Sequence, residues 1–417
     1  MSLLASSRAA RHLLATSVLA QLPLGMLGIG LMVHAQRLTG SFAAAGLVTG
    51  VYTIAVGIGS PLLGRLVDRG GQIAVLLGSA GAAVALLGTI AILPAHPPAA
   101  TLLLFATGIG LATPPVGAFL RALLPALLSD PARLSDAYAY ETSVVELCWV
   151  CGPPLVLALG ALWSTGGALA VSGLILLVAT AAFVAHPAAR ASRPESSLQR
   201  RRGGALRTPG MRALTVLLFG VGLLLGADEI AVTATARAID GTTAAAAPLL
   251  TVWGAGSFGG GLLFARFGHG GRNAGGLALL LLALTVGHLA LIPAAGAMAV
   301  LGGVLFIAGG AIAPSEATVY AMVGDVAPPG TITEAFAWLA GAMAVGSAGG
   351  AAVAGVAVDT AGATAAFALG GAAGALATLI AITRWRGLAR KQDAPQGLLL
   401  TYGDRRNEDV LRFGEGV

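Results

Sequence analysis

The sequence predicts an all-α polytopic membrane protein, and three observations lead to that fold class. Charged residues make up only 10% of the 417 residues, whereas a soluble globular domain carries about 25%. Hydrophobic residues make up 56%, which is too apolar for intrinsic disorder. They form long runs such as 73–93 and 168–185, unlike the alternating segments of a β-barrel, and within such runs only helices satisfy their own backbone groups in lipid.

Twelve apolar segments are long enough to cross a bilayer, which takes about 20 residues each. The longest polar break, 186–210, is rich in arginine and is predicted to be a linker between two six-helix bundles, 1–185 and 211–391, with a tail at 392–417. Small residues let such helices approach closely, as in 254–261 and 346–350. We predict the spans at 12–35, 43–64, 73–93, 101–121, 138–161, 165–185, 211–235, 245–265, 273–293, 297–322, 333–357 and 362–384.

Basic residues predict the orientation, because Lys and Arg concentrate in cytoplasmic loops. Of the 24 Lys and Arg, only Arg37 and Arg237 fall on the side opposite the linker. Both termini and the linker are therefore expected in the cytoplasm, with the chain in a plasma membrane, most simply a bacterial cytoplasmic membrane. The net charge of +6 then reflects topology, and no nucleic-acid partner is expected, since the linker lacks aromatic residues.

The two halves resemble each other in sequence. Gly64-x-Leu66-x-Asp68-Arg69 and Gly261-x-Leu263-x-Ala265-Arg266 follow the second and eighth spans, about 200 residues apart. Three further matches occur in the same order at nearly the same spacing: Arg37 with Arg237, Phe105 with Phe306, and Tyr138 with Phe336. This regularity indicates a duplicated six-span unit.

The residues 64–72, Gly-Arg-Leu-Val-Asp-Arg-Gly-Gly-Gln, resemble the signature between spans two and three of major facilitator superfamily transporters, with Gln72 where a basic residue is usual. Gly152-Pro153-Pro154 is similar to part of a motif of their proton-coupled drug antiporters. The arginine that such exporters often carry early in span four is not evident. The resemblance covers the whole topology and implies two six-helix halves related by a pseudo-two-fold axis along the membrane normal.

The resemblance also implies a cytoplasmic gate. Gly64 and Gly71 would allow close helix contact, and Asp68 would dock on the N-terminus of span eleven, because a helix N-terminus attracts anions. That span begins with Thr331-Ile332-Thr333-Glu334, a capping-box pattern, and Arg69 would pair across the bundle. The alternative is a plain topology loop with solvated charges. The remaining residues assigned to this gate are Arg121, Arg133, Arg266 and Glu334.

Acids within the spans are the candidates for proton and substrate coupling: Asp228, Glu229, Glu146, Glu316 and Glu141. A charge inside the membrane costs at least about 2.5 kcal/mol and usually has a function. We expect no Lys or Arg in the middle of a span to neutralise them, so these carboxylates could load and release protons. Glu141 is nearest the cytoplasmic end and could instead be a solvated or gate residue. The alternative for all five is a hydrogen bond to a neighbouring helix.

Other residues have weaker assignments. Arg37 and Arg237 are assigned to an extracellular gate, and the alternative is a position at the membrane interface. Cys148 and Cys151 are expected to pack within a helix, and no metal cluster is visible. Cavity lining is assigned to Trp149, Trp253 and Trp338, and helix bending to Pro114, Pro115, Pro153, Pro154 and Pro314.

The predicted function is secondary active transport by alternating access, with proton-coupled export of a small amphipathic drug or metabolite. The chain is expected to act as a monomer, without a cofactor and without enzymatic activity; its partners are the substrate, protons and the lipid bilayer. One alternative is proton-coupled uptake of a nutrient or metabolite. Others on the same scaffold are a lipid flippase and a non-transporting receptor, since a fold does not imply a function.

Overall fold

The computed structural model describes residues 8–69, 71–128, 130–191, 204–241, 245–267 and 273–389. Within them all regular structure is helical, and twelve segments are long and apolar enough to cross a membrane. The predicted all-α, twelve-span fold class is thereby confirmed. The predicted tail at 392–417 and the middle of the predicted linker lie outside the described residues.

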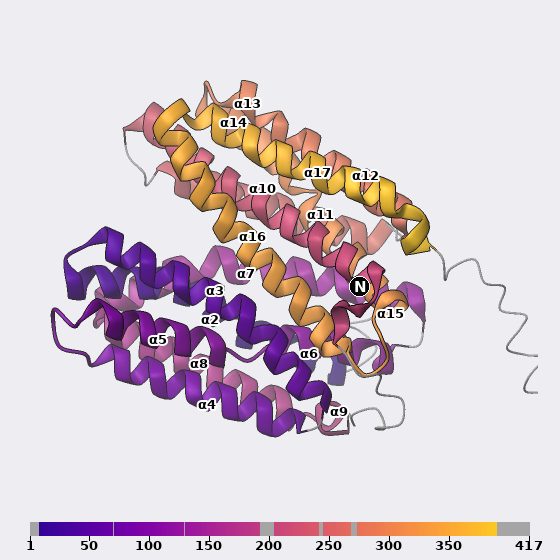
Figure 1. Cartoon of the computed structure of the whole chain (residues 1–417), viewed down its shortest axis with the longest axis horizontal. Helices are drawn as coiled ribbons and strands as arrows, with labels where there is room; N and C mark the ends of the chain where they lie inside the picture. The colour runs from indigo at the N-terminus through magenta and orange to yellow at the C-terminus, as the bar shows by residue number, and fades with distance from the viewer. Residues whose placement is uncertain are drawn as a thin grey trace, which may run out of the picture.

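Six spans form each half of the molecule (Figure 1). The N-terminal half comprises α2 (Arg8–Thr39), α3 (Phe42–Arg69), α4 (Gln72–Ala91), α5 (Ala99–Ala112) with α6 (Val116–Leu127), α7 (Pro131–Leu162) and α8 (Thr165–Ala185). The C-terminal half comprises α10 (Pro209–Asp240), α11 (Ala246–Phe267), α12 (Ala274–Leu289) with α13 (Leu291–Ala294), α14 (Met298–Gly309) with α15 (Ile312–Val326), α16 (Ile332–Ala361) and α17 (Ala363–Ala389). Between the halves lie the short helices α9 (Pro187–Ala191) and η1 (Ala205–Arg207).

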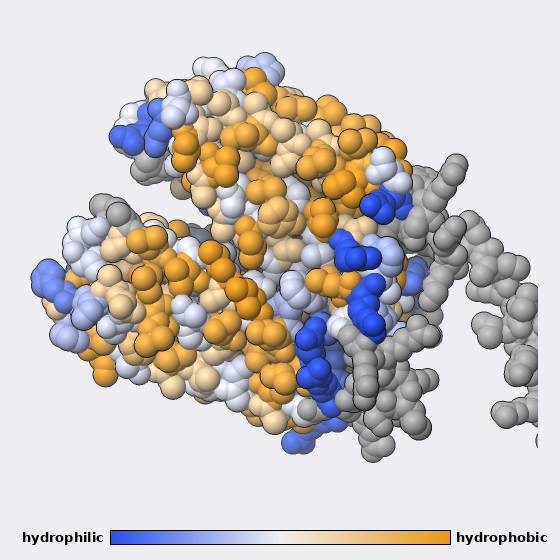
Figure 2. Space-filling view, viewed as in Figure 1, coloured by the Kyte–Doolittle hydropathy of each residue, from blue (hydrophilic) through white to orange (hydrophobic). Residues whose placement is uncertain are grey.

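The two halves meet at one end and separate at the other (Figure 1). We call the end that holds α6, α9 and α15 the linker end, and the opposite end the far end. Contacts between the halves run from α3 and α6 to α16 and from α7 to α11 and α15. Figure 2 shows the surface hollowed between the halves at the far end, and apolar side chains over much of the outer surface. Exposed residues such as Ile92, Leu104 and Ile307 belong to that apolar surface, as expected of a protein that faces lipid.

Proline affects the spans unequally. The fourth span is broken at Thr113–Pro115, between α5 and α6. In the tenth span the break precedes Pro314, which lies in the first turn of α15. Helix α7 instead continues through Pro153 and Pro154. After its break the fourth span continues to Leu127, beyond the predicted end at residue 121, which places Arg121 inside the helical bundle.

Glycine sets how closely α10 and α16 approach. A methyl group on Gly222 or Gly226 of α10 would collide with the carbonyl oxygen of Met343 or Ser347, respectively, on α16. The reciprocal collisions occur at Gly346 and Gly350 of α16, against the carbonyl oxygens of Phe219 and Leu223. Backbones can come this near only where small residues line both helices. The contact fixes α16, which packs against α3 of the N-terminal half, against the rest of its own half.

Candidate functional site

The linker end is closed by a contact between Asp68 and the start of α16. Asp68 Oδ1 accepts a hydrogen bond from the backbone N–H of Thr333 at 3.1 Å, and Oδ2 accepts one from Glu334 at 2.7 Å. These amides have no partner within their own helix, and their dipole favours an anion. One turn earlier, a Cβ on Gly64 would lie only 3.0 Å from the Cβ of Ala337. Helices α3 and α16, from opposite halves, are therefore in close contact here.

The predicted capping box at the start of α16 is wrong. Thr331 occupies the N-cap position but makes no side-chain capping hydrogen bond. Its Oγ1 donates instead to the carbonyl oxygen of Pro328 at 2.7 Å. The first amides of α16 donate hydrogen bonds to Asp68. A carboxylate from the other half therefore caps this helix in place of the local Thr331 side chain.

The ion pair that crosses between the halves uses Arg65 rather than Arg69. Arg65 Nη2 lies 2.7 Å from Glu334 Oε1, and Trp338 Nε1 also donates to that oxygen, at 3.3 Å. Arg69 is exposed, and among the described residues it makes no ion pair. The physical reason is the helical period: Arg65 precedes Asp68 by three residues and shares its face of α3, whereas Arg69 is turned about 100° from Asp68.

The linker takes part in this contact. A Cβ on Gly204 would collide with both Arg65 Nη2 and Glu334 Oε1. Ala205, the next residue, is completely buried, and Thr208 Oγ1 donates to the carbonyl oxygen of Val326 at 2.7 Å. The described end of the linker thus lies directly over the ion pair, a position that the sequence did not indicate.

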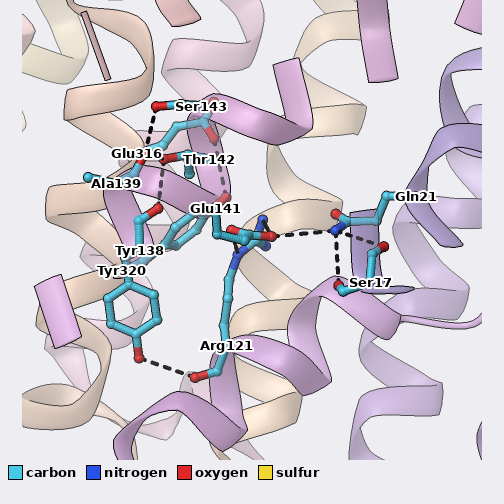
Figure 3. Close-up of polar contacts among 10 residues, drawn as sticks. All are labelled: Ser17, Gln21, Arg121, Tyr138, Ala139, Glu141, Thr142, Ser143, Glu316 and Tyr320. Carbon is cyan, nitrogen blue, oxygen red and sulfur yellow. Dashed lines mark hydrogen bonds and ion pairs between the residues drawn. The ribbon is translucent and has the colours of Figure 1, made fainter. Parts of the chain in front are cut away.

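A second ion pair lies inside the bundle (Figure 3). Arg121 of α6 binds Glu141 of α7 through two hydrogen bonds, Nε to Oε2 at 2.8 Å and Nη2 to Oε1 at 3.0 Å. Arg121 is 5% exposed and Glu141 is not exposed at all. Gln21 of α2 donates to Glu141 at 3.4 Å, and the guanidinium lies over the Tyr320 ring of α15, 4.2 Å from its centroid. The pair therefore connects three helices of the N-terminal half to one helix of the C-terminal half.

This pair corrects the expectation that no basic residue neutralises an acid within the spans. The sequence placed Arg121 at the end of its span, because a basic residue in an apolar run was interpreted as the membrane boundary. Since α6 continues to Leu127, Arg121 points inward and meets Glu141. A bidentate arginine–carboxylate pair satisfies both charges in a buried position.

Glu146 and Glu316 come from opposite halves, which meet along a seam, and lie near enough for the charge of Glu316 to act on Glu146. Glu146 belongs to α7 and Glu316 to α15, and each side chain is partly buried. The charges that act on Glu316 itself are those of Arg121, which is positive, and of Glu141, which is negative. Glu316 Oε2 also accepts a hydrogen bond from the Tyr320 hydroxyl at 3.4 Å. Because Arg121 is already paired with Glu141, the seam carries an excess of negative charge when both acids are ionised.

Asp228 and Glu229 lie apart from that seam and from each other. Asp228 is completely buried in the C-terminal half, where a Cβ on Gly370 of α17 would lie 2.5 Å from its Oδ1. Neither carboxylate oxygen of Asp228 has a hydrogen-bond partner in the described part of the chain. The side chain of Glu229 is exposed, on a different face of α10. The two neighbouring acids of α10 therefore have different surroundings and do not form one site.

A cavity of about 610 Å³ lies beside the seam and is lined by α2, α7 and α11. None of the five predicted acids lines it, and Leu155 in its wall is nine residues from Glu146, on the opposite face of α7. Cys151 also lines the cavity, whereas Cys148 is buried and donates to the carbonyl oxygen of Val18 at 3.4 Å. The full lining comprises Leu22, Val150, Cys151, Pro154, Leu155 and Thr251.

The remaining candidates occupy separate places. Trp149 is 56% exposed, and Trp253 packs edge to face against His288 inside the C-terminal half. Arg133 pairs locally with Asp130 at 3.5 Å, and Arg266 lies over Phe267. Arg37 and Arg237 are both exposed, in the last turns of α2 and α10. Among the described residues, no group of histidine, cysteine, aspartate or glutamate could hold a metal ion.

Two six-helix halves, joined by a linker and closed against each other at one end, define the class: a polytopic α-helical membrane transporter. The family model of the Major Facilitator Superfamily matches residues 13–319, and the chain belongs to that family. The resemblance seen in residues 64–72 is thereby confirmed at the level of the family. Membership makes this chain a non-enzymatic, multi-pass membrane transporter, which binds a small-molecule substrate within the lipid bilayer.

Solved structures support the same fold. The chain is similar to the human organic anion transporter MFSD10 (TETRAN), with 18% identity, coverage of 90% of this chain and 99% of that one, and a TM-score of 0.70. It is also similar to a bacterial homologue of the iron transporter ferroportin in the outward-facing state, with 15% identity, coverage of 91% and 100%, and a TM-score of 0.70. Comparison with curated protein sequences gives no match.

Proposed function

We propose that this protein is a proton-coupled secondary transporter that exports a small amphipathic cation by alternating access. One observation carries the proposal: Glu146 and Glu316 belong to helices of opposite halves that contact each other, α7 and α15, and the charge of Glu316 acts on Glu146. A rocking motion of the halves would change the environment of both acids at once. Such a pair can therefore link the binding of a proton or a cation to the opening and closing of the molecule.

The electrostatics of the seam favour exchange of a proton for a cation. Two carboxylates that share a poorly solvated site cannot both stay ionised without a compensating positive charge. Arg121 is held by Glu141 in a bidentate pair, so compensation must come from a proton or from a cationic substrate. Competition between the two ligands for one site is the requirement for antiport.

The conformation suits release to the outside. The halves are closed at the linker end by Asp68, Arg65 and Glu334 and are hollowed apart at the far end (Figure 2). The basic residues of the sequence favour a cytoplasmic linker end, which makes this state outward-facing. The fold similarity to the ferroportin homologue in its outward-facing state supports the same assignment.

Apolar surface near the seam supports an amphipathic substrate. Trp149, three residues after Glu146, leaves 56% of its surface exposed. An aromatic face and a carboxylate on neighbouring turns are the two features that bind a lipophilic cation. The named substrates of the similar structures are an organic anion and iron, and the excess negative charge at the seam makes a cation the better proposal here.

The proposal is tested with purified protein in liposomes that have an acidic lumen. We expect accumulation of radiolabelled tetraphenylphosphonium, a lipophilic cation, and its loss on adding a protonophore. Glu146→Gln and Glu316→Gln should each slow this accumulation at least about tenfold, equivalent to about 1.4 kcal/mol. Asp359→Asn removes an exposed acid near the far end of α16 and should transport at the wild-type rate.

Two results would refute the proposal. Accumulation that persists in the presence of the protonophore, after subtraction of protein-free liposomes, would show that protons do not drive transport. Wild-type rates in both glutamine variants would show that the seam acids do not couple it. Movement of the probe in the same direction as protons would instead identify the uptake mechanism.

A further inference from the structure

Asp228 occupies an enclosed position in the interior of the C-terminal half. It is not exposed at all, and both carboxylate oxygens lack a hydrogen-bond partner among the described residues. Gly370 of α17 lies against it, so close that a Cβ there would be 2.5 Å from Oδ1 and 3.2 Å from the carbonyl oxygen of Leu224. The carboxyl group is therefore shut between α10 and α17.

No charged group of the described chain compensates Asp228. Helix α10 packs against α11, α15, α16, α17 and η1. Burial, rather than a nearby charge, is what acts on the ionisation of the Asp228 carboxyl. None of the titratable groups with described side chains on these elements hydrogen-bonds or pairs with it. The groups with described side chains are Arg212, Glu229, Arg237 and Asp240 on α10, Arg266 on α11, Glu316, Tyr320 and Asp325 on α15, Glu334 and Asp359 on α16, Arg384 on α17 and Arg207 on η1.

We propose that Asp228 is a proton-binding site inside the C-terminal half, separate from the seam acids, and that it holds its proton in this conformation. An ionised carboxylate in a fully buried site without hydrogen bonds or a counter-charge is strongly disfavoured, whereas the protonated acid is neutral. The inference goes beyond the proposed function, because it concerns a second site that is enclosed in one half and does not face the seam.

Because of its position, the protonation state of Asp228 is linked to the packing of the helices around it. Release of the proton leaves a charge that only water or a new partner could stabilise, so α10 and α17 must separate for Asp228 to ionise. Helix α10 also packs along α16 through the reciprocal glycine contacts, and α16 begins with the amides that bind Asp68. Protonation inside the C-terminal half is thus placed to influence closure at the linker end.

Infrared spectroscopy tests the site directly, because a protonated carboxylic acid absorbs apart from a carboxylate. Wild-type protein labelled with carbon-13 at the aspartate side-chain carboxyl is reconstituted in lipid, and spectra are recorded at neutral pH. We expect an isotope-shifted band of a protonated aspartic acid. Asp228→Asn should abolish that band, and the double variant Glu146→Gln/Glu316→Gln should retain it, since its substitutions leave Asp228 in place.

The outcomes separate this inference from the proposed function. Absence of a protonated-aspartate band in the labelled wild-type protein overturns the site, even if Asp228→Asn fails to fold. Persistence of the full band in a folded Asp228→Asn protein overturns it as well. A retained band in a protein that shows no proton-driven transport would refute the proposed function alone and leave the Asp228 site standing.

Discussion

Arg121 and Glu141 show how two charges that would each be unfavourable within a span can be stable as a pair. Each alone would be an unfavourable ion in a site from which water is excluded. Together they form a bidentate pair, and Gln21 and the Tyr320 ring complete their surroundings. Among the described residues, Glu146 and Glu316 are left as the seam acids without a fixed positive partner of their own.

Removing only the arginine should therefore be costly. Arg121→Met keeps most of the side-chain volume but leaves Glu141 buried and unpaired, and we expect it to lower the free energy of unfolding by about 3–5 kcal/mol. The measurement is equilibrium unfolding in mixed micelles. Adding Glu141→Gln removes the orphaned charge and should recover a large part of the loss. A single variant as stable as wild type would contradict the role of the pair.

At the scale of helices, glycines determine the distances between spans. The contact of α10 with α16 depends on positions where any side chain would strike the backbone of the other helix, as at Gly350 against the carbonyl oxygen of Leu223. Gly355 of the same helix has open space around it: in the described part of the chain, no neighbouring atom lies within 4 Å of the place that a Cβ would take there. The two positions provide a matched pair.

Gly350→Ala should destabilise the protein by about 1–3 kcal/mol, because the added methyl group overpacks the contact between α10 and α16. Gly355→Ala should be neutral or stabilising by up to about 1 kcal/mol, since alanine favours a helix over glycine. Thermal and denaturant unfolding of the two variants, purified in the same detergent, measure the difference. Equal stability of the two would mean that the close helix contact contributes little.

At the scale of the whole molecule, closure at the linker end brings together residues that are distant in sequence. Asp68 binds the first amides of α16, Arg65 pairs with Glu334, and Gly204 of the linker lies over that pair. These contacts all join the N-terminal half or the linker to the C-terminal half. They must break together for the linker end to open, so they hold the closed state cooperatively.

Asp68→Asn should shift the molecule towards opening at the linker end and reduce transport, while membrane insertion is retained. Asparagine removes the charge that interacts with the helix dipole, worth about 0.3–1 kcal/mol at a helix terminus, and one of the two acceptor oxygens. Spin labels at Ala74 of α4 and Leu279 of α12, in a background without Cys148 and Cys151, report the distance between the halves. An unchanged distance distribution together with wild-type transport would contradict the role of Asp68.

Much of the architecture follows from local properties of the chain. The number of spans and the helical class depend on apolar length, and the family resemblance depends on a short run around Asp68; both predictions are confirmed. The acids within the spans could also be named from the sequence. Asp228 could not be separated from Glu229 in this way, because one residue of helical rotation decides whether a carboxyl faces Gly370 or an exposed surface.

The sequence by itself determined that the chain crosses a membrane twelve times, because burial of apolar side chains in lipid and satisfaction of backbone groups are local requirements. Only the tertiary structure decided which charges meet. It paired Arg121 with Glu141, and Glu334 with Arg65 rather than Arg69. It also placed Asp68 as the acceptor for amides that a local capping box was expected to satisfy. The physical reason is that these contacts join segments distant in sequence, whose positions are fixed by helix packing and not by any neighbour along the chain.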